Sequence, residues 1–125
     1  MITVVKEFTF DAAHWLPGYN GPCSNLHGHR WTLQVGIRGT VQDGMVMDFS
    51  KLKGIVKQEI INPLDHHCLN EVPLEGFPSG YPTAENMVIW IARTLLERIT
   101  LENHVSLSFI RLYETPTSYA EWRES

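Results

Sequence analysis

The chain has 125 residues, 43% of them hydrophobic, and a formal net charge of −4. This length fits one domain, residues 1–125, and not two. The ten Lys and Arg residues are scattered along the chain, which excludes the basic patch of a nucleic-acid binder. No apolar run is long enough for a membrane, and the charged start is unlike a signal peptide. We therefore expect a cytoplasmic location, in which Cys23 and Cys68 are free thiols.

An alternating pattern predicts the first strand from Ile2 to His14, where the even positions are apolar apart from Lys6. Such a strand buries one face, and His14 continues that face. Taken alone, a histidine that ends an apolar stripe is more often a hydrogen-bonded core residue than a metal ligand. The Pro, Gly and Asn residues between Trp15 and Pro22 then predict a loop.

The second predicted strand brings two further histidines to an apolar face. Its odd positions carry Trp31, Leu33, Val35 and Ile37. His27 and His29 have the same parity, and strand side chains repeat every second residue, so both imidazoles point to one side and converge. Gly28 between them leaves room for backbone or substrate to approach closely.

A hairpin and a helix are predicted in the middle of the chain. Asp43-Gly44 is typical of a hairpin turn, after which Met45 to Phe49 would return antiparallel to the second strand. Ser50 is expected to cap a helix from Lys51 to Ile61, which carries one apolar stripe and ends at Asn62-Pro63.

A polar loop and a second helix follow. In the loop, Asp65 precedes His66, which fits either a solvated pair at a helix end or a carboxylate that positions an imidazole for proton transfer. His67 comes next, and spacing alone does not decide which histidine faces a site. Thr83 is expected to cap the second helix, and Glu85 in its first turn suits the helix dipole without any further role.

The last predicted strand runs from Val105 to Glu114 and places Glu114 on a face that looks buried. The element order predicts an α+β fold, a four-stranded antiparallel sheet with two helices packed on one face. Such a sheet leaves open edges, which soluble proteins often cover by joining subunits. A homo-oligomer is therefore expected.

Three histidines are the candidate metal ligands. His14, His27 and His29 supply the number of nitrogen ligands that a catalytic zinc ion uses while it keeps a fourth position open. Cys23 lies four residues before His27 and could be the fourth ligand, which would close the site and make it structural. Alternatively, a free thiol beside a dication loses its proton more readily and can act as a base. The spacing leaves both interpretations open.

Six separated motifs together resemble the 6-pyruvoyltetrahydropterin synthase superfamily. They are Phe10-Asp11-Ala12-Ala13-His14, Cys23 with His27-Gly28-His29, Asp48-Phe49, Leu64 to Asn70, Pro82 to Asn86, and Glu114-Thr115. The motifs occur in order over nearly the whole chain, and they are most similar to the branch of the superfamily that serves the queuosine pathway.

The resemblance implies a role for each matching residue. His14, His27 and His29 match zinc ligands. Cys23, Asp65 and His66 match a proton-transfer triad in which the thiol is catalytic. Thr83, Glu85 and Glu114 match pterin-binding residues, with Glu114 gripping the ring.

The resemblance also implies a fold and a reaction. The fold is the tunnelling fold, in which sheets of neighbouring subunits join into a barrel and active sites lie between subunits, commonly in hexamers. The reaction is the zinc-dependent conversion of 7,8-dihydroneopterin triphosphate to 6-carboxy-5,6,7,8-tetrahydropterin, acetaldehyde and triphosphate. Two alternatives stay open: a pyruvoyl-forming synthase that eliminates triphosphate, and a non-catalytic, zinc-stabilised pterin-binding module.

Overall fold

Two long strands form the centre of the structure. In the computed structural model, which describes residues 1–125, β1 (Ile2–His14) and β2 (His27–Gly39) pair antiparallel over their full length. The even positions of β1 from Phe8 onward and the odd positions of β2 from Trp31 to Ile37 are buried, as the alternation predicts. The predicted range of the first strand is confirmed at both ends.

The sheet has five strands in the order β3-β1-β2-β4-β5. β4 (Val105–Thr115) pairs antiparallel with β2, β5 (Ser118–Arg123) pairs antiparallel with β4, and the two-residue β3 (His67–Cys68) lies parallel to β1. The prediction of a four-stranded, wholly antiparallel sheet is therefore wrong. β5 is a half-exposed edge strand without a buried apolar stripe, and β3 is too short for any periodicity to reveal it.

The predicted return strand from Met45 to Phe49 is also wrong. Only an isolated bridge joins Gln42 to Met45. The chain enters α1 (Phe49–Val56) instead, because the Asp48 carboxylate accepts a hydrogen bond from the backbone N–H of Ser50 at 2.7 Å. Asp48, and not Ser50, is thus the N-cap of the first helix.

The first helix continues past its predicted end. Residues Lys57–Ile61 form a wide π turn, labelled η2, and α2 (Asn62–Leu64) follows without a break. The Asn62 N–H donates to the Lys57 carbonyl, five residues back. Pro63 lies in the first turn of α2, where proline needs no N–H partner, so it does not stop the chain from winding on.

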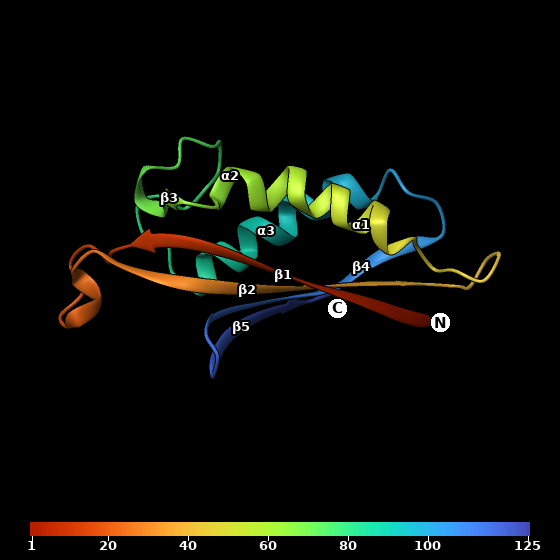
Figure 1. Ribbon diagram of the computed structural model, residues 1–125, viewed down its shortest axis with the longest axis horizontal. Coiled ribbons are helices and arrows are strands. Elements are labelled where there is room, and N and C mark those ends of the chain that lie inside the picture. The colour runs from red at the N-terminus through yellow and green to blue at the C-terminus, as the bar shows by residue number, and fades with distance from the viewer.

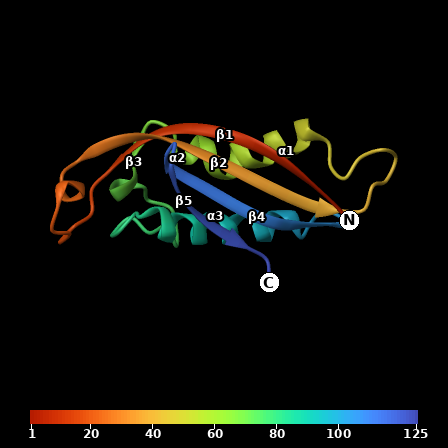
Figure 2. The same ribbon diagram turned by 90° about the horizontal axis from the view of Figure 1, so that it is seen from below.

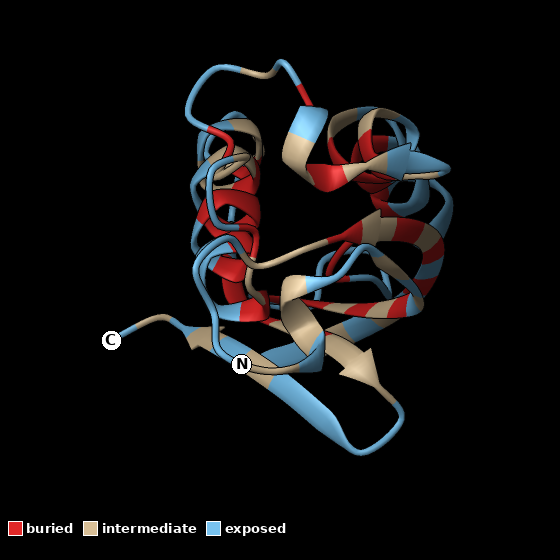
Figure 3. Cartoon of the chain, turned by 90° about the vertical axis from the view of Figure 1, so that its left-hand side faces the viewer, coloured by how far each residue is buried: buried red, intermediate tan, exposed pale blue.

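The second long helix is α3 (Ala84–Ile99), and Thr83 caps it as predicted. The Thr83 hydroxyl oxygen accepts a hydrogen bond from the Asn86 N–H at 3.1 Å. Both long helices run along the same face of the sheet (Figures 1 and 2), and the residues buried between helices and sheet form one core (Figure 3). Short 3-10 turns, η1 (Pro22–Ser24) and η3 (Leu69–Glu71), complete the element list. No helix has both the length and the apolar character needed to cross a membrane.

We call the sheet face opposite the helices the open face. Cross-strand polar pairs cover it: Arg30 with Asp11, Gln34 with Glu7, and Arg111 with Glu121. On one side of β1, residues 2–11 pair with no strand, and the outer edge of β5 is likewise free.

Gly36 makes room for an aromatic ring on the open face. A Cβ atom at Gly36 would come within 2.3 Å of the Phe109 ring, which lies under the guanidinium groups of Arg111 and Arg123. We therefore expect Gly36→Ala to lower the free energy of unfolding by about 1–3 kcal/mol, measured by urea titration. The reason is that the Phe109 ring must shift away from the added methyl group and lose its present contacts. Gly54→Ala in α1 is the control, because nothing lies within 4 Å of its added Cβ. It should raise stability by about 0.5–1 kcal/mol, and an equal loss in both variants would contradict the packing argument.

Candidate metal centre and active site

Three imidazoles meet where β1 ends and β2 begins. His14 lies opposite His27 in the β1–β2 register, and His29 is on the same face two residues further along β2. The ring centroids of the three pairs are 4.7, 4.8 and 5.4 Å apart. Trp31 packs against His14 and His29, which fixes one side of the cluster. The predicted convergence of the three histidines is present in the structure.

Backbone carbonyl groups set the orientation of two of these rings. His14 Nδ1 lies 2.8 Å from the carbonyl oxygen of Pro82, and His27 Nδ1 lies 2.7 Å from that of Asn25. Because a carbonyl oxygen only accepts hydrogen bonds, both Nδ1 atoms carry the proton. In the neutral rings the Nε2 atoms are then left with free lone pairs, the form in which histidine binds metals.

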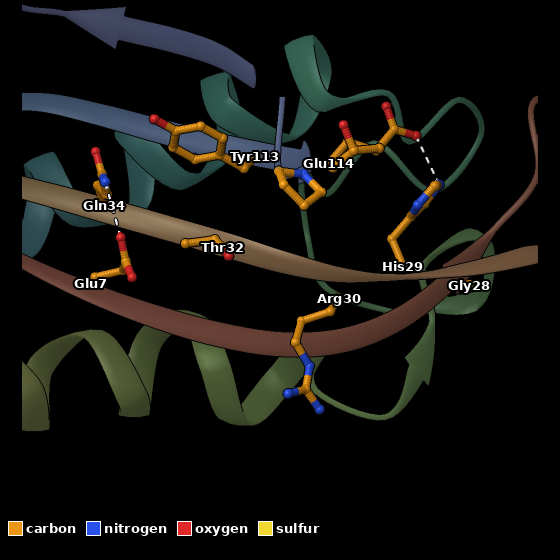
Figure 4. Close-up of a pocket in the computed structure, with 10 residues that line it drawn as sticks. Glu7, Gly28, His29, Arg30, Thr32, Gln34, Tyr113 and Glu114 are labelled. Carbon is orange, nitrogen blue, oxygen red and sulfur yellow. Dashed lines mark hydrogen bonds and ion pairs between the residues drawn. The ribbon is translucent and has the colours of Figure 1, made fainter. Parts of the chain in front are cut away.

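A carboxylate completes the cluster. Glu114 Oε1 lies 3.2 Å from His14 Nε2 and 3.1 Å from His29 Nε2, and Figure 4 shows the second of these contacts. Both Nε2 atoms are buried and lack a hydrogen bond of acceptable geometry. A lone pair facing a carboxylate oxygen in a buried place repels it unless a proton or a metal cation lies between them.

The donor set fits a divalent metal ion. One ligand atom from each of His14, His27, His29 and Glu114 lies within 4.8 Å of all the others. Imidazole nitrogens and carboxylate oxygens are both zinc ligands, and four such atoms match the tetrahedral coordination of zinc. The cluster can therefore hold a metal ion, and the pairing of Glu114 with the histidines is the feature that the sequence did not reveal.

The protonation states of the cluster suit metal binding. Burial lowers the pKa of His29, although the Glu114 carboxylate acts in the opposite direction. The His14 ring nitrogen, 3.2 Å from Oε1, holds the pKa of Glu114 below its usual range. At neutral pH His29 is thus a neutral nitrogen donor and Glu114 is ionised.

Cys23 lies outside this cluster. It belongs to η1, in the loop between β1 and β2, and its side chain is partly buried. The thiol is not among the groups that share the 4.8 Å neighbourhood of the histidines, so the structure does not form the closed set of one thiolate and three imidazoles. The loop itself is tied down, since the side chain of Asn70 hydrogen-bonds both backbone groups of Trp15.

Asp65 and His66 form a hydrogen-bonded pair at the edge of β1. Asp65 Oδ2 lies 2.9 Å from His66 Nδ1, and Asp65 Oδ1 accepts a hydrogen bond from the Asp11 N–H at 2.9 Å. The hydrogen bond from the Asp11 N–H holds the pKa of Asp65 below its usual range, and the hydrogen bond with the His66 ring adds to this effect. His67 instead donates from Nδ1 to the Asp65 carbonyl oxygen, so His66 is the histidine that pairs with the carboxylate.

Hollows in the surface connect these groups. His66 and His29 line one hollow together with Gly28 and Arg30. His29, Gly28 and Arg30 also line the hollow drawn in Figure 4, which reaches Glu114. Glu85 lines a third hollow, again with Glu114, whereas the Thr83 side chain is engaged as a helix cap. Apart from Cys23, Asp65 and Thr83, the predicted site residues thus belong to the cluster or line one of these hollows, and Asp65 adjoins them through its contact with His66.

The fold and the cluster define a class of protein: an α+β domain with a metal-sized centre at the end of an antiparallel sheet. The family model for 6-pyruvoyl tetrahydropterin synthase matches residues 3–125, so the chain belongs to that family. It is a pterin-processing enzyme family by the names of its members.

Individual relatives agree with this assignment. In an alignment 145 positions long, the chain is 40% identical to the 6-carboxy-5,6,7,8-tetrahydropterin synthase of Haemophilus influenzae. The alignment covers 99% of this chain and 100% of that protein. The chain is 34% identical over 111 residues to the dihydroneopterin monophosphate aldolase of Pyrococcus furiosus, covering 89% and 88% of the two chains. The structure of the 6-pyruvoyl tetrahydropterin synthase of Caenorhabditis elegans superposes with a TM-score of 0.82 at 27% identity, over 99% of this chain and 96% of that one.

The metal centre can be tested by removing one ligand. We expect the wild-type chain to retain zinc through dialysis and His29→Ala to lose it, measured by elemental mass spectrometry, because two imidazole nitrogens hold zinc less well than three. His104→Asn is the matched control, since His104 lies in a turn with φ of 58° that asparagine also adopts. Zinc retained by His29→Ala, or none bound by the wild type, would contradict the assignment.

Proposed function

We propose that this protein is a zinc-dependent lyase of the queuosine pathway, located in the cytoplasm. Its substrates are 7,8-dihydroneopterin triphosphate and one water molecule, and its products are 6-carboxy-5,6,7,8-tetrahydropterin, acetaldehyde and triphosphate. The observation that carries the proposal is the cluster of His14, His27, His29 and Glu114, adjoined through one hollow by the Asp65–His66 pair. The full-length relative named for this product supports the choice of reaction.

The residues divide the chemistry between them. A zinc ion held by His14, His27 and His29 would supply Lewis acidity toward the side-chain oxygens of the substrate. Cys23 takes a proton from the substrate side chain. His66 transfers a proton on another face, and Asp65 holds its ring in orientation through the 2.9 Å contact at Nδ1. No redox cofactor is needed, because proton transfers, loss of triphosphate, addition of one water molecule and cleavage of one carbon–carbon bond account for all the products.

Binding of the pterin ring falls to the acidic side chains. A pterin presents adjacent N–H donors that one carboxylate can accept together, and charge-assisted hydrogen bonds of this kind are about twice as strong as neutral ones. Glu114 performs this task, and Glu85 lines the neighbouring hollow that Glu114 shares. Thr83 contributes by fixing the start of α3, which carries Glu85.

The assembly that we propose is a homo-oligomer, with a hexamer favoured. The free edges of β1 and β5 support it, because unpaired edge strands are rarely left exposed in soluble proteins. Sheets of neighbouring copies would pair along these edges into a barrel, with active sites between subunits.

A second candidate is the elimination of triphosphate to form a pyruvoyl product. The superposition on the Caenorhabditis elegans 6-pyruvoyl tetrahydropterin synthase favours it, and it would use the same residues in the same roles. The third candidate is a zinc-stabilised module that binds a pterin without turnover.

Product analysis separates these candidates. The zinc-loaded protein is incubated anaerobically with 7,8-dihydroneopterin triphosphate, and the pterin product and acetaldehyde are identified by mass spectrometry. We expect the 6-carboxy product together with acetaldehyde. A pyruvoyl product would establish the second candidate, and unchanged substrate with bound zinc would favour the third.

Replacing the thiol tests its role as a base. Cys23→Ala should retain zinc, since the thiol lies outside the metal-sized cluster, and should lower kcat by at least about 10²-fold, since general-base catalysis contributes that much. Cys68→Ala is the matched control for thiol chemistry. Loss of zinc from Cys23→Ala would show that the thiol is a ligand and favour the structural interpretation.

Replacing the carboxylate distinguishes its two contacts. If Glu114 grips the pterin, Glu114→Gln should raise KM by at least about tenfold, the value of one charge-assisted hydrogen bond, and leave the zinc content unchanged. Steady-state kinetics and elemental mass spectrometry on the same preparation measure both. Zinc loss would instead make Glu114 a metal ligand.

A further inference from the structure

The backbone of Asp11 anchors the Asp65–His66 pair. The Asp11 N–H donates to Asp65 Oδ1 at 2.9 Å, and the Asp11 carbonyl oxygen accepts from the His66 N–H at 2.6 Å. These two groups point to the free side of β1, where β3 begins to pair at Ala12. His66 is held there with a φ of 61°, a left-handed conformation that is uncommon for residues other than glycine.

The side chain of Asp11 is a potential competitor within this arrangement. A carboxylate oxygen of Asp11, one of Asp65 and a ring nitrogen of His66 all lie within 4.8 Å of one another. A histidine beside two carboxylates can hydrogen-bond either of them, and each choice turns the ring differently. Something must therefore keep Asp11 away from the His66 ring.

Arg30 engages the Asp11 carboxylate. Arg30 Nε donates to Asp11 Oδ1 at 3.0 Å, and Nη2 donates to Oδ2 at 3.2 Å, so both oxygens are used in a forked contact. The two residues are direct partners in the β1–β2 register. Figure 4 shows the Arg30 side chain extending from β2 across β1, away from His29 and Glu114. The fork holds the pKa of Asp11 below its usual range, so the carboxylate stays ionised and paired.

We propose that Arg30 is a positioning residue for the Asp65–His66 pair. The forked contact holds the Asp11 carboxylate at the Arg30 guanidinium, while His66 Nδ1 pairs with Asp65. The imidazole then keeps one tautomer and one direction, with Nε2 free to meet the substrate. This inference rests on the proposed function, in which His66 transfers a proton.

The test uses two variants of the zinc-loaded protein, Arg30→Gln and the double variant Asp11→Asn/Arg30→Gln. Arg30→Gln should lower kcat by about tenfold and leave KM within about twofold, as expected when a supporting hydrogen bond is lost. The double variant should recover most of kcat, because the competing carboxylate is gone. Arg38→Gln is the matched control, since Arg38 lies on the same strand and forms a comparable ion pair with Glu124 at 2.8 Å, far from the site.

A second readout does not depend on turnover. Nitrogen-15 NMR of the imidazole reports which ring nitrogen of His66 carries the proton. The wild type should show the Nδ1–H tautomer, Arg30→Gln should show a mixture, and the double variant should return to the wild-type signal.

Several results would overturn the inference. A raised KM at unchanged kcat in Arg30→Gln would make Arg30 a substrate-binding residue. A loss of kcat that the double variant does not recover, or an unchanged His66 signal in Arg30→Gln, would equally refute positioning. If the wild type shows no turnover while the His66 signals behave as expected, the proposed function fails and the orientation of the ring by Arg30 stands.

Discussion

The in-register pairing of β1 with β2 is the constraint on which the site depends. It sets His14 opposite His27 and Ala12 opposite His29, so that three imidazoles share one face and the small alanine leaves them space. A slip of one residue would turn every side chain of one strand to the other face. The apolar residues beyond the histidines, with Trp31 at 0% exposure, oppose such a slip because it would expose them to water. The core therefore fixes the metal centre.

The β1–β2 pairing also gives the two faces of the sheet different roles. Toward the helices, it assembles the core and the metal-sized cluster. On the open face, it aligns polar partners such as Asp11 and Arg30, and the backbone groups of Asp11 then reach sideways to hold Asp65. One strand residue thus links the open face to the proton-transfer pair, while its neighbours in β1 belong to the buried side.

Sequence periodicity predicts much of this arrangement, and its failures have physical causes. Parity predicts that His27 and His29 point to one side and that His14 continues the buried face of its own strand, but the β1–β2 register is needed to bring the three together. Spacing alone does not decide whether His66 or His67 pairs with Asp65. The proximity of Glu114 to the histidines depends on the register between β2 and β4, which shifts at an irregularity after Gly36 and leaves no trace in the pattern. The Arg30–Asp11 fork likewise needs a register between strands. β5 was missed because half-exposed edge strands carry a weak apolar signal.

The π turn at Lys57–Ile61 has a consequence for the spacing along the first helix. A wide turn holds one more residue than an α-helical turn, so the helix after it is rotated by about 100° relative to an unbroken helix. After this turn the chain reaches the edge of β1, where the Asp65 carboxylate accepts a hydrogen bond from the Asp11 N–H. The length of this segment therefore determines the direction in which the chain leaves the helix. With one residue fewer, the segment would wind as a regular helix, and Asp65 would leave it on a different side of the helix axis.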